Sequence, residues 1–263
     1  MTACRLRRLA LCGLGLALTC ALGIAIAAAG ASQTPLIAID VGHSLSRPGA
    51  TSARGEPEFA FNRGLALVVE RALRQRGFRT RLIGEQGDFD KLTDRPAAAQ
   101  SAGATFFLSV HHDSVQPQYL EEGLIDGRER KYSDRFSGFS LFVSRSNSAP
   151  EKSLACARGI GQELRRDGYA PSLHHAEPIR GENRPLADGA NGIYYFDDLI
   201  VLKTAPMPAV LFEAGIILNR ADELLLLQPS TRQRLAAAIA EGLRDCLRLP
   251  SKPIAKTGAS AKP

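Results

Sequence analysis

The sequence predicts a single layered α/β domain in which helices flank a twisted sheet that is mostly parallel or mixed. Short apolar runs typical of buried strands alternate with segments whose apolar residues recur at helical spacing. The composition, with 44% hydrophobic and 23% charged residues, is that of an ordinary globular protein. A length of 263 residues suits one such domain better than two.

The first half of the domain alternates strands and helices. We expect a buried strand at 36–39 that ends at Asp40, followed by a helix over 61–73 that stops at Gly77. A strand at 78–83 comes next, and then a helix capped by Thr93 or Asp94 that runs to Gly103. A third strand is expected at 105–110.

The second half is expected to contain three more strands and two long helices. The predicted strands are 139–143, 193–203 and 209–212, and a helix is expected over 149–168. Ser230 and Gln233 form a capping box that opens the last helix. The polar stretches 116–137 and 171–192 fit neither pattern and are longer than ordinary connections, so we expect functional or mobile loops there.

The first segment has the layout of a secretory signal peptide, which we assign to residues 1–31. Three arginines precede an uncharged stretch at 9–29, and small residues lead to Ser32. Because this stretch approaches the length of a membrane span, a retained N-terminal anchor is an alternative, and lipidation at Cys20 is another. Each predicts export to the periplasm or cell envelope. The catalytic domain is then 32–249, and 250–263 forms a disordered basic tail.

Charge and cysteine content limit the partners. The net charge of +6 falls to +3 without the three arginines of the first segment, which fits weak attraction to an anionic envelope polymer. No nucleic-acid motif is present, so we expect no nucleic-acid partner, and a membrane contact only if the first segment is retained. Cys156 and Cys246 remain after processing, and we expect two buried thiols, although export permits a disulfide.

Metal-binding residue types follow the predicted strands. His43, His111 and Glu213 stand at strand ends, and Glu58 stands at the head of the first helix. Ligand sites in such sheets collect at the carboxyl ends of the strands. Two histidines and one carboxylate form the ligand set of several catalytic zinc sites, and a further carboxylate can move protons. The pattern predicts metal-dependent hydrolysis of an amide.

Four blocks in order resemble the zinc-dependent N-acetylmuramoyl-L-alanine amidases, the bacterial cell-separation amidases. They are IDVGH at 39–43 with PGA at 48–50, EFAFN at 58–62, FLSVHHD at 107–113, and PAVLFEAG at 208–215 with Asn219. Arg95 also sits where the family tends to have an arginine, and the likeness covers residues 36–247. Val41, Ser44, His112 and Ile216 depart from the family pattern, which puts loop shape and substrate preference in doubt.

The resemblance implies a role for each block. His43, Glu58 and His111 would bind Zn²⁺, and Glu213 would be the catalytic carboxylate that activates water. The substrate would be peptidoglycan, cut at the amide between N-acetylmuramic acid and L-alanine of the stem peptide. We expect a monomer.

Two choices within the ligand set remain open from the residues alone. Glu56 could replace Glu58, but the spacing of Glu58 to Asn62 matches the family block. His112 could replace His111, but neighbours in a strand face opposite ways, so only one can point at a metal. The family block favours His111, and His112 is expected to line the pocket or to contact a ligand.

The other polar residues are expected to play supporting roles. His174 and His175 suggest a metal, but a solvated loop or a substrate-facing edge is the favoured interpretation. Asp40 and Asp113 are expected to orient ligands or to cap loops. Arg95 and Asn219 are expected to be structural.

Two other functions were weighed against the amidase. A catalytically silent module that binds peptidoglycan or a divisome partner would have no need of Glu213. A zinc peptidase acting on the stem peptide is disfavoured by the four blocks. Some relatives block their zinc site with an inserted helix, so here Glu121 and Glu122, or the 171–192 segment, would cover the groove until an activator protein displaces them.

Overall fold

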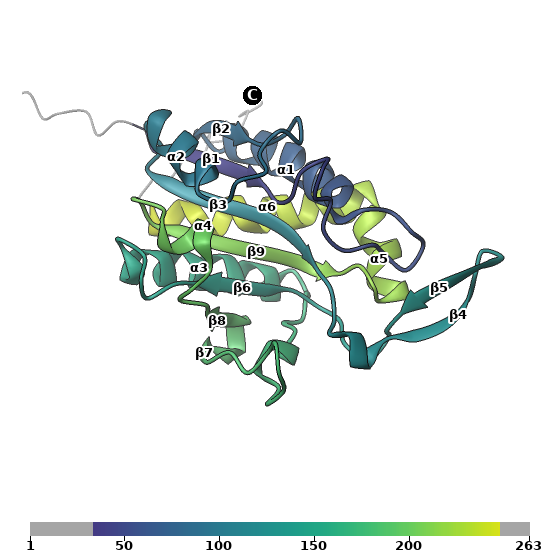
Figure 1. Cartoon of the computed structure of the whole chain (residues 1–263). Helices are drawn as coiled ribbons and strands as arrows, with labels where there is room; N and C mark the ends of the chain where they lie inside the picture. Colours follow the sequence, from purple (N-terminus) through teal and green to yellow (C-terminus); the bar gives the residue numbers. More distant parts are fainter. Residues whose placement is uncertain (1–33, 248–263) are drawn as a thin grey trace, which may run out of the picture. The chain divides into compact units, whose positions relative to one another are not determined.

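A seven-stranded mixed sheet flanked by helices forms the centre of the computed structural model, which describes residues 34–247 (Figure 1). This confirms the predicted fold class. The predicted segment 1–31 and the tail 250–263 lie outside the described residues. Within 34–247, no helix combines the length and the apolar character needed to cross a membrane. The strands are β1 Leu36–Val41, β2 Arg79–Ile83, β3 Phe106–Asp113, β4 Glu121–Ile125, β5 Arg128–Tyr132, β6 Ser140–Val143, β7 Leu186–Asp188, β8 Ile193–Tyr195 and β9 Ala209–Ile216.

The order of strands across the sheet is β2-β1-β3-β9-β6-β8-β7. The four strands β2, β1, β3 and β9 run parallel, and β6 pairs antiparallel with β9. Parallel strands end at the same edge of a sheet. The residues that follow β1 and those that end β3 and β9 are therefore brought together.

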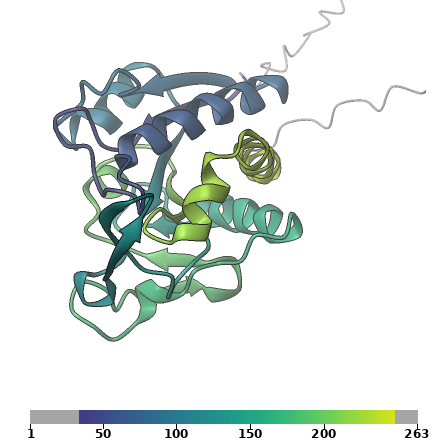
Figure 2. The same ribbon diagram turned by 90° about the vertical axis from the view of Figure 1, so that its right-hand side faces the viewer.

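Helices cover both faces of the sheet. They are α1 Glu58–Gln75, α2 Asp94–Ser101, α3 Pro150–Arg166, α4 Ile200–Lys203, α5 Arg220–Leu227 and α6 Pro229–Cys246. The helices α1, α3 and α6 lie on one face, with α6 between α1 and α3, and α2 and α4 lie on the other (Figure 2). Ile37 and Ile39 belong to the first core and Ala38 to the second. Because both faces are buried, β1 reads as an unbroken apolar run.

A disulfide between Cys156 and Cys246 joins α3 to the end of α6. The expectation of two buried thiols is therefore wrong. The helices approach closely because Gly159 and Gly242 have no side chains. A Cβ on Gly159 would lie 2.4 Å from the carbonyl oxygen of Gly242. This crossing brings the Cα atoms of the two cysteines to 5.1 Å, a separation typical of disulfides. The apolar spacing of the two helices could not predict that approach.

Three other expectations about elements are corrected. The last helix begins at Pro229, directly after α5, and no side chain caps it, so Ser230 and Gln233 form no capping box. The predicted strand 193–203 is β8 followed by the single turn α4. The helix α5 was not anticipated, and the side chain of Asn219 caps it by accepting from the N–H groups of Ala221 and Asp222.

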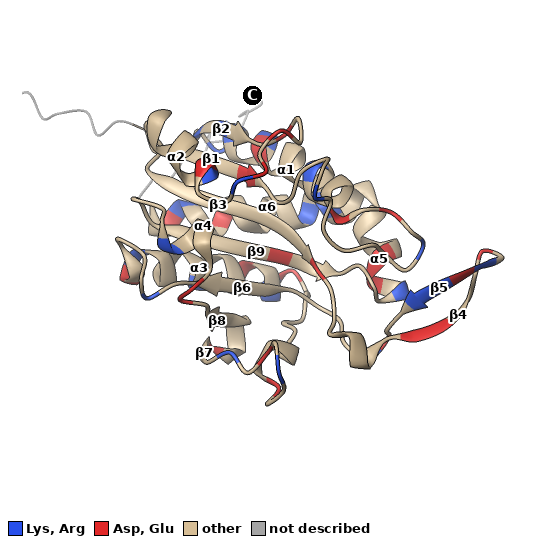
Figure 3. Cartoon of the chain, in the orientation of Figure 1, with Lys and Arg blue, Asp and Glu red and all other residues tan. Residues whose placement is uncertain are grey.

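The stretch 116–137 is a hairpin rather than an irregular loop. Strands β4 and β5 pair antiparallel in a separate two-stranded sheet. Acidic residues mark β4 and basic residues mark β5 (Figure 3). Glu122 pairs with Lys131 across the strands at 3.5 Å. Such cross-strand charge pairs stabilise a hairpin, and they read as a polar loop when only the composition is considered.

Candidate active site and metal centre

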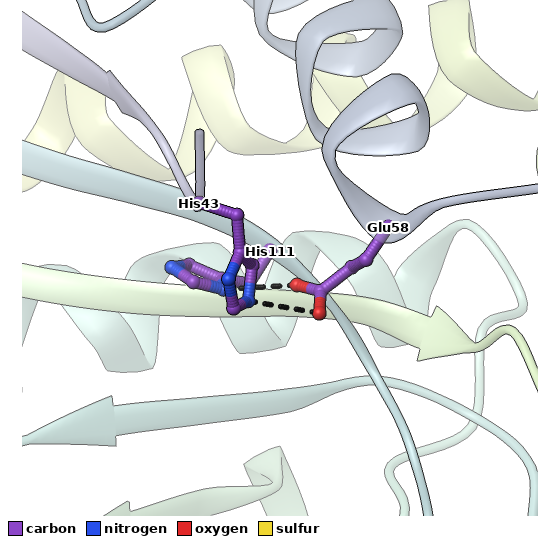
Figure 4. Close-up of side chains that lie close together, drawn as sticks. All are labelled: His43, Glu58 and His111. Carbon is purple, nitrogen blue, oxygen red and sulfur yellow. Dashed lines mark hydrogen bonds and ion pairs between the residues drawn. The ribbon is translucent and has the colours of Figure 1, made fainter. Parts of the chain in front are cut away.

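The side chains of His43, Glu58 and His111 converge at the carboxyl edge of the sheet (Figure 4). His43 follows β1, Glu58 is the first residue of α1, and His111 lies near the end of β3. Their ligand atoms all lie within 4.8 Å of one another. The rings of the two histidines meet edge to face with centroids 4.9 Å apart. The structure therefore brings together the three residues that the sequence predicted as ligands.

Glu58 is the buried member of this cluster. Its Oε2 lies 2.9 Å from Nε2 of His43, and its Oε1 lies 3.0 Å from Nδ1 of His111. Burial opposes ionisation of Glu58, but hydrogen bonds from His111 and His43 and the charges of those rings hold its pKa well below its ordinary value. The partial positive charge at the start of α1 also favours a carboxylate there. Glu58 therefore presents an ionised ligand.

Neighbours of Glu58 hold its carboxylate in place. Asn62, one turn along α1, donates from Nδ2 to Oε1 of Glu58 at 3.0 Å and to the carbonyl of Gly42 at 3.2 Å. The N–H of Ala50 donates to Oε2 at 3.2 Å. The competing Glu56 is exposed, and its N–H binds Ser52 instead. The helical spacing of Glu58 and Asn62 thus serves the geometry of the cluster.

His112 points away from the cluster, as the alternation of a strand requires. Its Nδ1 lies 2.8 Å from Oδ1 of Asn62, and its ring packs against Phe61. Complete burial lowers the pKa of His112 to about 3, so the ring stays neutral. The ring of His112 therefore acts on Glu58 through Asn62, and its backbone N–H lies 3.4 Å from Oε1 of Glu58.

Two glycines leave the space that the cluster occupies. A Cβ on Gly42 would lie 2.3 Å from Nε2 of His111. A Cβ on Gly49 would lie 2.4 Å from Oε2 of Glu58 and 2.7 Å from the ring of His43. No side chain tolerates such distances without displacing its neighbour. Sequence reasoning identified both glycines as parts of family blocks but did not identify this steric role.

Arg95 fixes the backbone that carries His43. His43 has a φ of 67°, in the left-handed region that residues with side chains rarely adopt. The guanidinium of Arg95 donates to the carbonyls of His43, Val41 and Phe89, and it pairs with Asp40 at 2.7 Å. Asp40 also accepts from Ser109. Arg95 is therefore structural, as expected, and it orients a predicted ligand.

Glu213 lies on β9 directly opposite His111 of β3 in the parallel register. In-register neighbours point to the same face, so the carboxylate of Glu213 is on the side of the sheet that His111 faces. Its Oε2 is shielded from solvent and has no hydrogen-bond partner within residues 34–247. Burial and then the charges of Asp113 and Glu58 raise the pKa of Glu213 well above its ordinary value. A buried carboxyl group with a perturbed pKa beside the cluster is a candidate for proton transfer.

A second group of titratable side chains adjoins the first. Asp113 ends β3, and its Oδ2 lies 2.8 Å from Nε2 of His175. Both His174 and His175 are buried, so the expectation of a solvated loop is wrong. Burial opposes protonation of His175, but Asp113 and Glu182 outweigh it and raise the pKa to about 9. Glu182, which sequence reasoning missed, accepts from Nδ1 of His175 at 2.7 Å.

The sequence is similar to a family model and to individual proteins that are amidases. The model of the N-acetylmuramoyl-L-alanine amidase family matches residues 37–245. The chain is 28% identical over 218 residues to the amidase AmiA of Escherichia coli strain K12, which covers 79% of this chain and 74% of that protein. It is also 28% identical over 215 residues to the sporulation-specific amidase of Bacillus subtilis strain 168, covering 81% and 68% respectively.

Solved structures share the fold. The catalytic domain of the amidase CwlV from Bacillus (Paenibacillus) polymyxa var. colistinus aligns with a TM-score of 0.61 and 25% identity, covering 82% of this chain and all of that one. The amidase Ami1 of Mycobacterium smegmatis gives a TM-score of 0.64 at 23% identity over 81% of this chain and 97% of the other, a likeness of fold. With the family model matched across nearly the whole described domain, this chain belongs to the N-acetylmuramoyl-L-alanine amidases, the hydrolases that cut the amide between N-acetylmuramic acid and L-alanine in peptidoglycan.

Proposed function

We propose that this amidase is zinc-dependent, that His43, Glu58 and His111 bind the metal, and that Glu213 is the catalytic carboxylate. The convergence of two imidazoles and one ionised carboxylate at the strand ends carries the proposal. This donor set fits zinc, which takes three protein ligands in catalytic sites and leaves a fourth position open.

The ligands differ in exposure in a way that suits a substrate. The side chain of Glu58 is 6% exposed, whereas those of His111 and His43 are 18% and 31% exposed. The carboxylate of Glu58 forms the buried side of the site, and the two imidazoles form the side that faces solvent. A polymer such as peptidoglycan can therefore approach from the solvent side of the histidines.

A bound zinc ion supplies a Lewis acid that polarises the scissile carbonyl and makes water a better nucleophile. Glu213 takes the proton that the attacking water loses, since its free Oε2 has no other partner within the described chain. Glu213 then delivers this proton to the leaving amide nitrogen. An amide nitrogen needs that proton because it is a poor leaving group.

The decisive experiment is digestion of purified peptidoglycan by the purified protein, with the products identified by mass spectrometry. Stem peptides that begin with L-alanine are expected, and they should disappear with a chelator and return with added zinc. Glu213→Gln should abolish cleavage but keep the catalytic zinc, whereas Glu58→Gln should lose cleavage together with the zinc ion of the catalytic site. Glu56→Gln is the matched control, because Glu56 is exposed two residues away. Cleavage within the stem peptide instead would contradict the assignment.

The cellular setting is also part of the proposal. We infer export from the signal-like segment 1–31, with 32–249 as the catalytic domain and 250–263 as a tail. One solved amidase with the same fold, CwlD of Clostridioides difficile, is in complex with the GerS lipoprotein. By analogy, an envelope protein that regulates this chain is a candidate partner. Deleting the hairpin of β4 and β5, which carries Glu121 and Glu122 and lies outside the seven-stranded sheet, tests self-inhibition, and unchanged cleavage by that variant would argue against it.

A further inference from the structure

The second cluster of titratable side chains has no part in the reaction described above. It consists of Asp113 at the end of β3 and of His174 and His175 in the 3₁₀ turn His174–Ala176. Asp113 and His175 are 62 positions apart in the sequence. The ligand atoms of all three residues nevertheless lie within 4.8 Å of one another. All three residues are buried.

One nitrogen in this cluster lacks a partner. The side chain of His174 is 1% exposed, and its Nε2 makes no hydrogen bond to any described residue. Oδ2 of Asp113 lies 3.5 Å from this nitrogen, beyond ordinary hydrogen-bond length, and the backbone of Ser114 also lies close enough to act on the ring. A buried polar atom left unpaired destabilises the folded state. Nε2 of His174 therefore faces the carboxylate of Asp113 but is too far away to form a hydrogen bond with it.

The other ring nitrogens are held by hydrogen bonds. Nδ1 of His174 lies 2.9 Å from Oγ of Ser172, and Nδ1 of His175 lies 2.7 Å from Oε2 of Glu182. The amide of Gln116 in turn donates to Glu182 at 2.8 Å. Metal-binding histidines almost always donate their second ring N–H to such a partner, which fixes the tautomer and leaves the first nitrogen free for the metal.

The Nε2 atoms of both histidines turn toward the same carboxylate oxygen, and only that of His175 is hydrogen-bonded to it. The two rings lie side by side, with centroids 3.8 Å apart and planes tilted by 38°. Oδ2 of Asp113 lies 2.8 Å from Nε2 of His175 and 3.5 Å from Nε2 of His174. His175 alone already bonds both Asp113 and Glu182, so these ion pairs do not account for the unpartnered nitrogen of His174.

We propose that Asp113, His174 and His175 form a second binding site, specific to a divalent transition-metal ion such as Zn²⁺. Two imidazoles and one carboxylate suit such ions, and the fourth position would be filled by water or by a group of the substrate. The ion would join the 171–192 segment to the end of β3. It would also lie near Glu213, since the charge of Asp113 acts on that carboxyl group.

The test is the zinc content of the full chain after equilibrium dialysis, measured by elemental mass spectrometry. Wild type should hold about two ions per chain, and His174→Gln about one. Glu58→Gln should also hold about one, because it removes the other ion. The double variant should hold none. Glu56→Gln, altered at an exposed carboxylate, should keep about two.

The outcomes separate this site from the first. A single ion in wild type that survives in His174→Gln and is lost in Glu58→Gln overturns the second site and leaves the catalytic site intact. A single ion with the opposite behaviour supports the second site and contradicts the catalytic ligand set. If His174→Gln does not fold, Glu182→Gln replaces it, because loss of a partner to a ligand should weaken the second ion about 10–100-fold. Unchanged affinity in that variant would also overturn the proposal.

Discussion

Gly42→Ala should disable the active site without unfolding the protein. The added Cβ would lie 2.3 Å, 2.4 Å and 2.5 Å from the Nε2, Cε1 and Cδ2 atoms of His111. Ordinary contact begins at 3.4 Å, so the imidazole must move by about 1 Å. Gly42 is not among the residues with positive φ, so its backbone accepts alanine and the ring alone opposes the change.

The expected loss follows from that displacement. A misplacement of about 1 Å at a catalytic centre can lower the rate about 100-fold. This corresponds to about 2.7 kcal/mol of transition-state stabilisation. The assay is release of stem peptides from peptidoglycan, with zinc affinity measured in parallel by competition with a chelator. Both quantities should fall, whereas far-ultraviolet circular dichroism should not change.

Gly189→Ala provides the matched control. Its Cβ would meet only the side chain of Leu186 at 3.4 Å, an ordinary contact. This variant should keep both cleavage and zinc affinity. If Gly42→Ala cleaves peptidoglycan within about threefold of Gly189→Ala and binds zinc equally well, the steric argument for the cluster is refuted.

Three further perturbations test the scaffold. Cys156→Ser together with Cys246→Ser should lower the free energy of unfolding by about 2–5 kcal/mol, measured in urea, because the disulfide closes a loop with a sequence separation of 90. Arg95→Met should cost about 3–5 kcal/mol in the same assay, since it leaves the carboxylate of Asp40 buried without its cation. Asp222→Asn should become more stable relative to wild type as pH rises. Burial raises the pKa of Asp222 in the folded state, although hydrogen bonds from two backbone N–H groups partly oppose this rise. Protonated Asp222 therefore stabilises the wild-type fold below pH 3.8, and this contribution is lost as pH rises through the folded-state pKa.

Each of these predictions has a control that isolates its cause. Reductant should destabilise wild type and leave the double serine variant unchanged, and equal sensitivity would contradict a role for the disulfide. Arg71→Met changes an exposed arginine on α1, and a loss as large as that of Arg95→Met would argue against the buried pair. Asp198→Asn changes a carboxylate that is 93% exposed, and a similar pH trend there would show that the effect of Asp222 is not due to burial.

The strands that carry the site could be predicted because their local pattern agrees with the fold. Each of β1, β3 and β9 begins with a continuous apolar stretch, which reflects burial on both faces. Since parallel strands share an edge, the residues after these runs had to meet. His43, His111 and Glu213 could therefore be grouped before any coordinates were known, and the four sequence blocks identified Glu58 as their companion.

Two elements escaped prediction. The hairpin of β4 and β5 is polar, and its local signal, Asp126 and Gly127 with positive φ in the two-residue turn, was missed. The helix α5 was missed although Asn219 gives it an N-cap, and the apparent capping box beside it is not formed because Pro229 begins α6. The two possible N-caps, Asn219 and Ser230, are only local signals for a helix start. The packing of α5 against β9 and α6 decides which of them is used.

The sequence by itself determined the fold class, the family and the identity of the predicted ligands, because periodicity and ordered blocks are written along the chain. Only the tertiary structure decided which residues become neighbours across it. It paired Cys156 with Cys246, placed Arg95 on the carbonyl of His43, and packed His174 and His175 against Asp113. These contacts depend on how closely helices and loops approach one another, and that distance is set by the packing of many side chains together.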